Sequence, residues 1–268
     1  MVKGLQLFVE YFKNWKESYV LIGGAACDLW MGSQGLSFRA TKDLDLVLIV
    51  EALKPEFFKL FWAFIREGQY KSHQHTETRP GFYRFKNPAI SDYPYMIELL
   101  TRNQLRMPES VHLTPLPAGE NVSSLSAILL DETYYRFIVD SRILLSGIPI
   151  IPAYALIPLK ARAWLDLTER RTRGDPQVKG DDIKKHRHDI FRLYLTLAPS
   201  DRFDLPMLLR QDLAQFLGHL PPDSSDWNSI RKAVQDAALP GPEEIIQQFG
   251  RMFGLDSKSG SQDAVKIG

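Results

Sequence analysis

The stretch from Tyr19 to Val50 restricts the possible fold more than any other part of the chain, because two short apolar runs are separated by a glycine pair and a polar loop. The first run, Val20–Ile22, ends at Gly23 and Gly24, and an amphipathic segment and the polar loop then lead to the second run, Leu46–Val50. Short apolar runs bounded by turn residues are typical of buried strands, and a periodic segment between them is typical of a helix. The stretch therefore predicts a strand, a glycine turn, a helix, a loop and a second strand.

Two aspartates, Asp43 and Asp45, stand at the start of the second predicted strand. Because side chains alternate across a strand, these two carboxylates are expected on the same face. Paired carboxylates repel each other, and a divalent cation is the usual reason to tolerate the arrangement. Mg²⁺ is typically held by one or two carboxylates together with substrate phosphates. The alternative is that both aspartates lie at a strand end that is exposed to solvent and bind no cation.

The glycine pair supplies a second feature that suits a phosphate. Without Cβ atoms at Gly23 and Gly24, the backbone turns sharply and approaches a ligand closely, and the N–H groups at the start of the next helix face an anion. An ordinary strand-to-helix turn is the alternative. The order of the two motifs within one short unit favours a phosphate-handling site with Mg²⁺.

Composition sets the broad class of protein. The chain has 268 residues, of which 44% are hydrophobic and 24% charged, and its net charge is +1. These values are typical of a soluble globular protein, and any basic surface must be local. One cysteine, Cys27, excludes an intrachain disulfide and a thiolate zinc site. Neither a signal peptide nor an apolar run of membrane-spanning length is visible, so we expect a cytoplasmic protein with no membrane partner.

The rest of the first 150 residues reads as helices and strands around this stretch. Apolar spacing predicts a helix within residues 3–18 and another over Leu53–Glu67, followed by strands at Gly81–Phe85 and Tyr95–Leu100. Glu98 interrupts the last apolar run and is costly to bury alone. It is either a third acid beside the aspartates or a side chain that faces water from an edge strand.

Beyond Glu98 the pattern changes twice. Residues 101–122 read as a loop, and strands are expected at Val122–Leu130 and Tyr134–Ser141. After Pro152 the periodicity is helical, and we expect Pro158 in the first turn of the first of these helices. The predicted helices are Ala153–Arg171, Asp181–Leu197, Pro206–Leu220, Trp227–Ala238 and Glu243–Phe253. Domain boundaries follow: a core over 1–150, a helical region over 151–253 that completes a cleft, and a disordered tail over 254–268.

The order of these motifs resembles the nucleotidyltransferase superfamily typified by DNA polymerase beta. The segments LIPLKARAWLDLTERR at 156–171, IKKHRHDIFRLYL at 183–195 and RATKDLDLVL at 39–48 are more specifically similar to AbiEii-type nucleotidyltransferases, which are toxins of abortive-infection and type IV toxin–antitoxin systems. The resemblance covers roughly residues 19–197 in order. It implies an α+β fold with a nucleotidyltransferase-type mixed sheet, flanking helices and a C-terminal helical region.

The resemblance also implies a role for each matching residue. Asp43, Asp45 and Glu98 would hold Mg²⁺. Gly23, Gly24, Lys160 and Lys185 would bind the nucleoside triphosphate (NTP), the co-substrate, and Lys160 would neutralise its phosphates. Glu98 could instead deprotonate the acceptor hydroxyl, and Asp189 could orient Lys160 or Lys185 or act as the base. Ala25 stands where many superfamily members carry serine, so phosphate binding would rest on backbone N–H groups and basic side chains.

Each of these residues also has a simpler interpretation. Lys160 could extend its ammonium group from an apolar helix to solvent. The charges at Lys184, Lys185 and Arg187 could form a solvated helix face, and His186 and His188 lack a third ligand for zinc.

The resemblance implies nucleotide transfer from an NTP to an acceptor hydroxyl, with tRNA or another RNA as candidate acceptor and an antitoxin protein as candidate partner. The alternatives are a non-catalytic module that binds nucleotide or protein, and transfer to a small-molecule hydroxyl.

Overall fold

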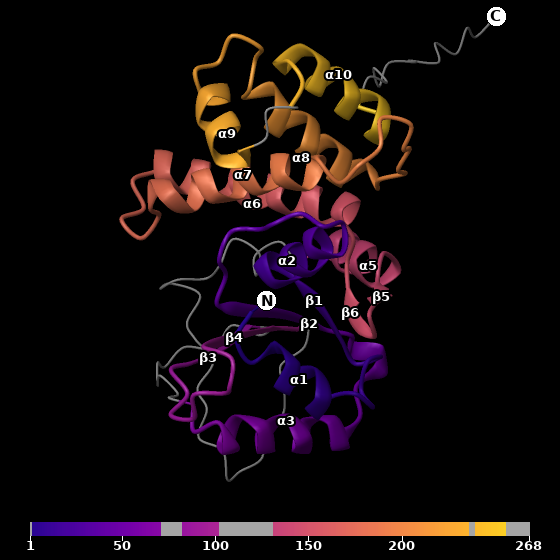
Figure 1. Ribbon diagram of the computed structural model, residues 1–268, viewed down its shortest axis with the longest axis vertical. Coiled ribbons are helices and arrows are strands. Elements are labelled where there is room, and N and C mark those ends of the chain that lie inside the picture. The colour runs from indigo at the N-terminus through magenta and orange to yellow at the C-terminus, as the bar shows by residue number, and fades with distance from the viewer. Residues whose placement is uncertain (1, 71–81, 102–130, 236–238, 256–268) are drawn as a thin grey trace, which may run out of the picture.

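A computed structural model of the chain describes residues 2–70, 82–101, 131–235 and 239–255. In these ranges a six-stranded mixed sheet carries helices on both faces, and further helices form a second layer at one side (Figure 1). The predicted strand Val122–Leu130, all but the first residue of the predicted loop over 101–122, and residues 256–268 of the predicted tail lie outside the described residues. No helix in the described ranges combines the length and apolar character needed to cross a membrane.

The sheet is built around the two strands that the sequence predicts. Strands β1 (Tyr19–Ile22) and β2 (Asp43–Leu48) are antiparallel and lie at the centre of the order β3-β4-β2-β1-β6-β5. On one side β2 pairs in parallel with β4 (Met96–Leu100), whose outer neighbour is β3 (Phe82–Lys86). On the other side β1 pairs in parallel with β6 (Ile148–Ile150).

The outer strand on that side is β5 (Ile143–Leu145), which pairs with β6 in antiparallel register. Ser146 and Gly147 both have positive φ values of 49° and 79° in the connecting turn, a geometry that suits a two-residue hairpin. β1 is completely buried, as expected for a central strand that helices cover on both faces.

Helices cover the sheet on opposite faces (Figure 1). α1 (Leu5–Tyr11) and α3 (Pro55–Glu67) lie on one face, and their aromatic side chains pack together, with Phe8 and Phe64 ring centroids 5.5 Å apart. Pro55 opens α3 at a position where its missing N–H costs nothing, and Gly68 ends it. On the opposite face lies α2 (Gly23–Ser33), which starts directly at the glycine pair.

The C-terminal helices form a layer above α2. The long helix α6 (Ala153–Thr172) packs along α7 (Gly180–Tyr194), and both contact α2. The remaining helices, α8 (Met207–Gly218), α9 (Asp226–Val234) and α10 (Pro242–Phe253), stack on the far side of this pair (Figure 1). One continuous apolar core joins the sheet, its flanking helices and this layer.

Two predictions about local structure are wrong. The expected strand Tyr134–Ser141 is the helix α5 (Glu132–Asp140). Asp131 caps it by accepting hydrogen bonds from the N–H groups of Thr133 and Tyr134, at 2.8 Å and 3.4 Å. The aromatic and β-branched residues suggested a strand, but the buried ones recur at helical spacing and form one face against the core.

The second error concerns Pro158, which we placed in the first turn of its helix. α6 begins at Ala153, so Pro158 lies one turn further in, where its ring removes the hydrogen bond to the carbonyl of Tyr154. Pro152 precedes the helix and occupies the position that suits proline.

Candidate active site

The glycine turn brings the backbone against one of the aspartates. Gly23 has φ +64°, and a Cβ atom there would lie 1.8 Å from Oδ2 of Asp45. The N–H of Gly24 donates to the same oxygen at 3.4 Å. A Cβ on Gly24 would lie 2.5 Å from Oγ1 of Thr41. Both glycines are therefore required by close packing, and the start of α2 faces a carboxylate, the charge that a helix N-terminus favours.

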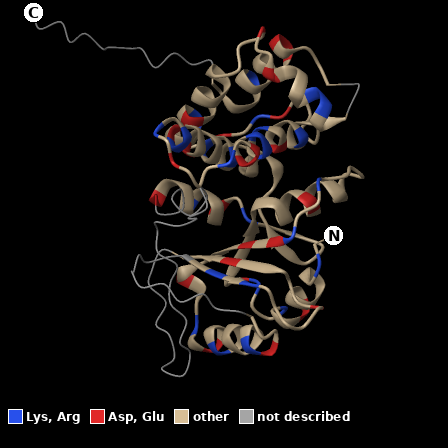
Figure 2. Ribbon diagram, turned by 90° about the vertical axis from the view of Figure 1, so that its left-hand side faces the viewer, with Lys and Arg blue, Asp and Glu red and all other residues tan. Residues whose placement is uncertain are grey.

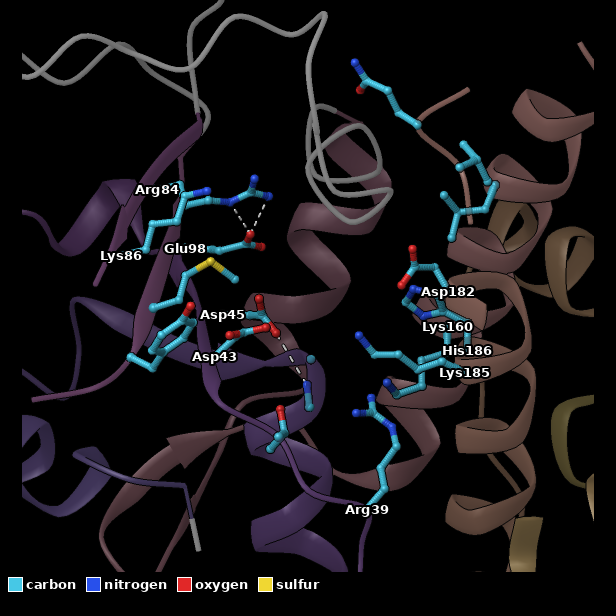
Figure 3. A pocket seen from close by; sticks show the side chains of 18 of the residues that line it. Arg39, Asp43, Asp45, Arg84, Lys86, Glu98, Lys160, Asp182, Lys185 and His186 are labelled. Atoms are coloured by element: carbon cyan, nitrogen blue, oxygen red, sulfur yellow. Dashed lines mark hydrogen bonds and ion pairs between the residues drawn. The ribbon is translucent and has the colours of Figure 1, made fainter. Parts of the chain in front are cut away.

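Asp43 and Asp45 lie side by side on one face of β2, as their spacing predicts, and their carboxyl groups point into the same cleft (Figure 3). Burial, and then the neighbouring charge of Asp45, raises the pKa of Asp43 above its usual value, and Lys185 across the cleft opposes this rise. The unfavourable pairing of two acids is the electrostatic condition that a bound cation would relieve.

Glu98 lies beside Asp45 because β2 and β4 pair with these two residues in register. β4 is an inner strand and Glu98 is 4% exposed, so the alternative of an edge-strand side chain that faces water is wrong. Arg84 on β3 is its direct cross-strand neighbour and forms an ion pair with it at 2.5 Å. Burial, followed by the charge of Asp45, raises the pKa of Glu98 to about 8, against the opposing effect of Arg84.

The acids face a basic wall across a cleft of about 470 Å³. Figure 3 shows Arg39, Lys160 and Lys185 extending toward the aspartates from the opposite side. Lys160 is on α6, Lys185 is on α7, and Arg39 is in the loop before β2. Basic and acidic residues occur on both the sheet and the helical layer (Figure 2). Across the cleft, the acid pair on β2 thus faces two lysines of the helical layer.

Lys160 does not reach solvent, so the interpretation in which it extends its ammonium group outward is wrong. The residue is 3% exposed, and its Nζ donates to Oδ2 of Asp189 at 2.9 Å. Burial alone would lower the pKa of Lys160, but the Asp189 carboxylate outweighs it and the net pKa is raised. The ammonium group is therefore held charged at the edge of the cleft.

Asp189 is fully buried behind Lys160 and is not among the described residues that line the cleft. It accepts two hydrogen bonds from Arg39, both at 2.8 Å, and one from Arg192 at 3.0 Å in addition to that from Lys160. Burial raises the pKa of Asp189, but Lys160 and Arg39 reverse this and hold it well below its usual range. Because this ionised carboxylate already accepts hydrogen bonds from two arginines and a lysine, it is better suited to orient those cations than to accept a proton.

Lys185 is half-buried on α7, with its ammonium group in the cleft and opposite Asp43. Within the described ranges it forms neither a hydrogen bond nor a salt bridge, unlike Lys160. Its neighbour His186 also lines the cleft, and its buried Nδ1 has no hydrogen-bond partner in the described structure. Burial, and then the charge of Lys160, lowers the pKa of His186 to about 3, so the ring is neutral.

The residues fit a divalent cation of the Mg²⁺ type in part. Two carboxylates on one strand face, next to a glycine turn that a Cβ would fill, match the few protein ligands that Mg²⁺ uses beside phosphates. Among the described residues, however, no three His, Cys, Asp or Glu side chains are arranged as a metal site. Asp43 and Asp45 are therefore the candidate ligands, and Glu98, which lies beside Asp45 and pairs with Arg84, stays a predicted third ligand.

Sequence reasoning missed several residues of the cleft. Arg39 and Thr41 belong to the RATKDLDLVL segment, so their distance of a few residues from Asp43 was an available signal. Arg84 and Lys86 lie in the cleft because β3 pairs with β4, and no sequence pattern predicts that pairing. Asp182 lies one helical turn before His186 on α7. The sequence does not show which turn of this helix faces the cleft, so it gave no signal for Asp182.

The six-stranded mixed sheet, its flanking helices and the C-terminal helical layer are consistent with a nucleotidyltransferase-type fold. A family model described as "Nucleotidyl transferase AbiEii toxin, Type IV TA system" matches residues 7–266, and the chain belongs to this family. The expected family and fold class are confirmed. The family description indicates nucleotidyl transfer in a type IV toxin–antitoxin system, which implies an antitoxin partner. The search among curated proteins found no match.

Proposed function

We propose that this protein is a Mg²⁺-dependent nucleotidyltransferase that moves a nucleotide from an NTP to the hydroxyl group of an RNA acceptor such as tRNA. The observation that carries this proposal is the opposition of an acid pair, Asp43 and Asp45, to a wall of cations across one cleft. The phosphates of an NTP need positive charge along their length, and the reacting phosphorus needs a cation beside it. The cleft offers both in one place.

The reaction forms one bond and breaks one. The acceptor oxygen attacks the α-phosphorus of the NTP, the bond to the bridging oxygen breaks, and pyrophosphate leaves with the electron pair while the hydroxyl proton is released. Mg²⁺ held by Asp43 and Asp45 would neutralise charge on the transferring phosphate. Lys185, with no acidic partner in the described structure, would bind the phosphates, and Lys160 would add fixed positive charge.

Asp189 is a positioning residue in this proposal. It holds Lys160 and Arg39 against the cleft, and the bidentate Arg39 contact also ties the loop before β2 to α7. Glu98 remains the candidate to receive the hydroxyl proton, since its pKa of about 8 lies close to neutral pH.

The test is transfer of label from each radiolabelled NTP to total RNA, with Mg²⁺ present. Asp43→Asn and Asp45→Asn should abolish incorporation and leave folding largely intact, because cation ligands and not core contacts are lost. Asp223→Asn is the matched control, since Asp223 is exposed and outside the cleft lining.

Nucleotide binding without incorporation into any acceptor would instead support a non-catalytic binding module. Label on a small metabolite would show transfer to a small-molecule hydroxyl.

A further inference from the structure

The acid pair divides the cleft into two ends. Toward α2 and the helical wall lie the glycine turn, Arg39, Lys160 and Lys185, which suit the triphosphate (Figure 3). Away from the helical wall, Glu98 lies beside Asp45, followed by the β3 side chains of Arg84 and Lys86 (Figure 3). In an in-line displacement the acceptor oxygen approaches opposite the leaving pyrophosphate. If the proposed function holds, on which this inference rests, the acceptor enters from the β3–β4 end.

Tyr95 stands at that end, immediately before β4. It is 47% exposed and lines the cleft. Its neighbour Met96 pairs with Asp43 in the sheet, so the ring lies one residue beyond the acid pair. The carbonyl oxygen of Tyr95 accepts a hydrogen bond from the N–H of Asn87 at 3.0 Å, which fixes the backbone that carries the ring. The other exposed large hydrophobic side chains of the described structure are outside the cleft lining: Ile90, Ile143, Leu144 and Met207.

One lysine contacts this ring, and a second lies on the neighbouring strand. Nζ of Lys42 lies 5.7 Å from the centroid of Tyr95, within the range of a cation–π contact. Lys86, at the end of β3, also lines the cleft and pairs with Met96, the residue after Tyr95. Throughout the part of the chain that the structure describes, neither lysine has an acidic partner. Proteins bind unpaired nucleotides with exposed aromatic rings that have cations nearby.

We propose that Tyr95, Lys42 and Lys86 form the acceptor subsite, in which Tyr95 stacks against the 3′-terminal base of single-stranded RNA and the lysines contact its last phosphates. Unpaired ends are the part of an RNA whose bases are free to stack on aromatic side chains. A protein partner would instead be expected on a wider apolar surface, but the cleft lining that includes Tyr95 also includes the charged Arg84 and Lys86.

The probe is a single-stranded RNA oligonucleotide with 2-aminopurine as its 3′-terminal base, whose fluorescence falls when the base stacks. A duplex with the same base paired at a blunt end is the comparison. Wild type should bind and quench the single strand in preference to the duplex. Tyr95→Ala should weaken that binding about 5-fold to 150-fold, the range for loss of one stacked base, and Tyr95→Phe should restore it to within about 2-fold.

The lysines are tested by salt dependence. Lys42→Ala and Lys86→Ala should each reduce the slope of log affinity against log salt by about 0.7, the value for one phosphate contact on a single strand. Lys59→Ala is the matched control, because Lys59 is exposed on α3, and Met207→Ala is the control for an exposed apolar residue. Both should behave as wild type.

Equal binding of the probe by Tyr95→Ala and wild type would overturn the subsite, as would equal affinity for the duplex or no RNA binding by wild type. The proposed function is measured separately, by NTP–Mg²⁺ binding and incorporation. Incorporation that needs Asp43 but not Tyr95 would reject the subsite alone. Tyr95-dependent RNA binding with no incorporation would reject nucleotidyl transfer alone.

Discussion

At the scale of single residues, the basic wall of the cleft is organised by one buried acid. Asp189 is fully buried and holds three cations, yet only two of them, Lys160 and Arg39, line the cleft. Lys185 does not share this partner and projects freely toward Asp43 within the described structure. Lys160 is thus paired with an acid and Lys185 is not within the described structure, so the two lysines should respond differently to substitution.

Lys185→Ala should weaken NTP binding by about 1.5–3 kcal/mol, about 10-fold to 150-fold, because one charge-assisted contact with phosphate is lost. Its melting temperature should barely change, since the side chain has no partner in the described structure. Lys184→Ala, one residue earlier on the exposed side of α7, is the matched control for both measurements. Calorimetry that shows wild-type NTP affinity in Lys185→Ala would remove this lysine from the site.

Asp189→Asn should destabilise the fold by about 3–5 kcal/mol, because three cations lose a buried anionic partner. Urea unfolding measures the loss, and NTP affinity should fall in parallel as Lys160 and Arg39 shift. If Asp189 were the catalytic base, the variant would instead bind NTP normally and lose only the transfer step. Single-turnover rates across pH at saturating NTP separate the two roles.

His186 should make the fold sensitive to acid. Its folded-state pKa of about 3 lies below the unfolded value of about 6.5, so between these pH values only the unfolded chain binds the proton. The free energy of unfolding should therefore fall as pH drops below about 6.5, with a contribution of up to about 1.4 kcal/mol per pH unit from this residue.

His186→Gln should remove that part of the slope. Comparison of the two proteins at pH 8, where the histidine is neutral in both states, isolates any loss of packing. An unchanged slope between pH 4 and 6.5 would show that the ring is not buried in solution.

At the scale of elements, the junction of β1 and α2 sets the geometry of the site. The helix begins without any residue between it and the strand, and this requires the left-handed φ of Gly23. The same junction directs the start of α2 toward Asp45. The second glycine, Gly24, is required by contact with Thr41 and not by its backbone angle.

Gly23→Ala should disrupt the site, because its Cβ would overlap the Asp45 carboxylate and its positive φ is strained for alanine. We expect loss of NTP–Mg²⁺ binding and a fall in melting temperature. Gly32→Ala in the same helix is the control: no atom lies within 4 Å of the added Cβ, and the change should stabilise by about 0.4–1 kcal/mol. Equal behaviour of the two variants would contradict the assigned geometry.

At the scale of the whole molecule, the cleft exists because two halves of the chain share one core. α2 belongs to the sheet but also packs against α6 and α7, and the apolar core runs through all of them. The Arg39–Asp189 contact crosses the same junction. The predicted boundary near residue 150 therefore separates two regions of sequence whose side chains pack together.

Unfolding should be a single cooperative transition. Phe191 lies in the core of the helical layer, and Phe191→Ala should lower the free energy of unfolding by about 3–5 kcal/mol. The sheet should unfold at the same, lower midpoint as the helical layer. Hydrogen exchange of α3 and α8 reports on the two halves separately, and Met207→Ala is the exposed control. Loss of protection in α8 with α3 unchanged would show two independently folding units.

The sequence by itself determined the features that depend on neighbouring residues. The strand, turn, helix and strand around the glycine pair follow from local backbone sterics and apolar spacing, and the shared face of Asp43 and Asp45 follows from strand alternation. The helical spacing of apolar residues predicts most helices of the C-terminal layer. These signals need no knowledge of the rest of the chain.

Only the tertiary structure decided which distant residues became neighbours. The register of β4 placed Glu98 beside Asp45 and gave it Arg84 as a partner, and the packing of α7 on α6 buried Lys160 against Asp189. Whether a charge is solvated or paired depends on the surroundings that folding brings to it, and no local pattern contains them. The helix α5 was missed for a related reason, since its aromatic residues suit a strand until the core shows which face they cover.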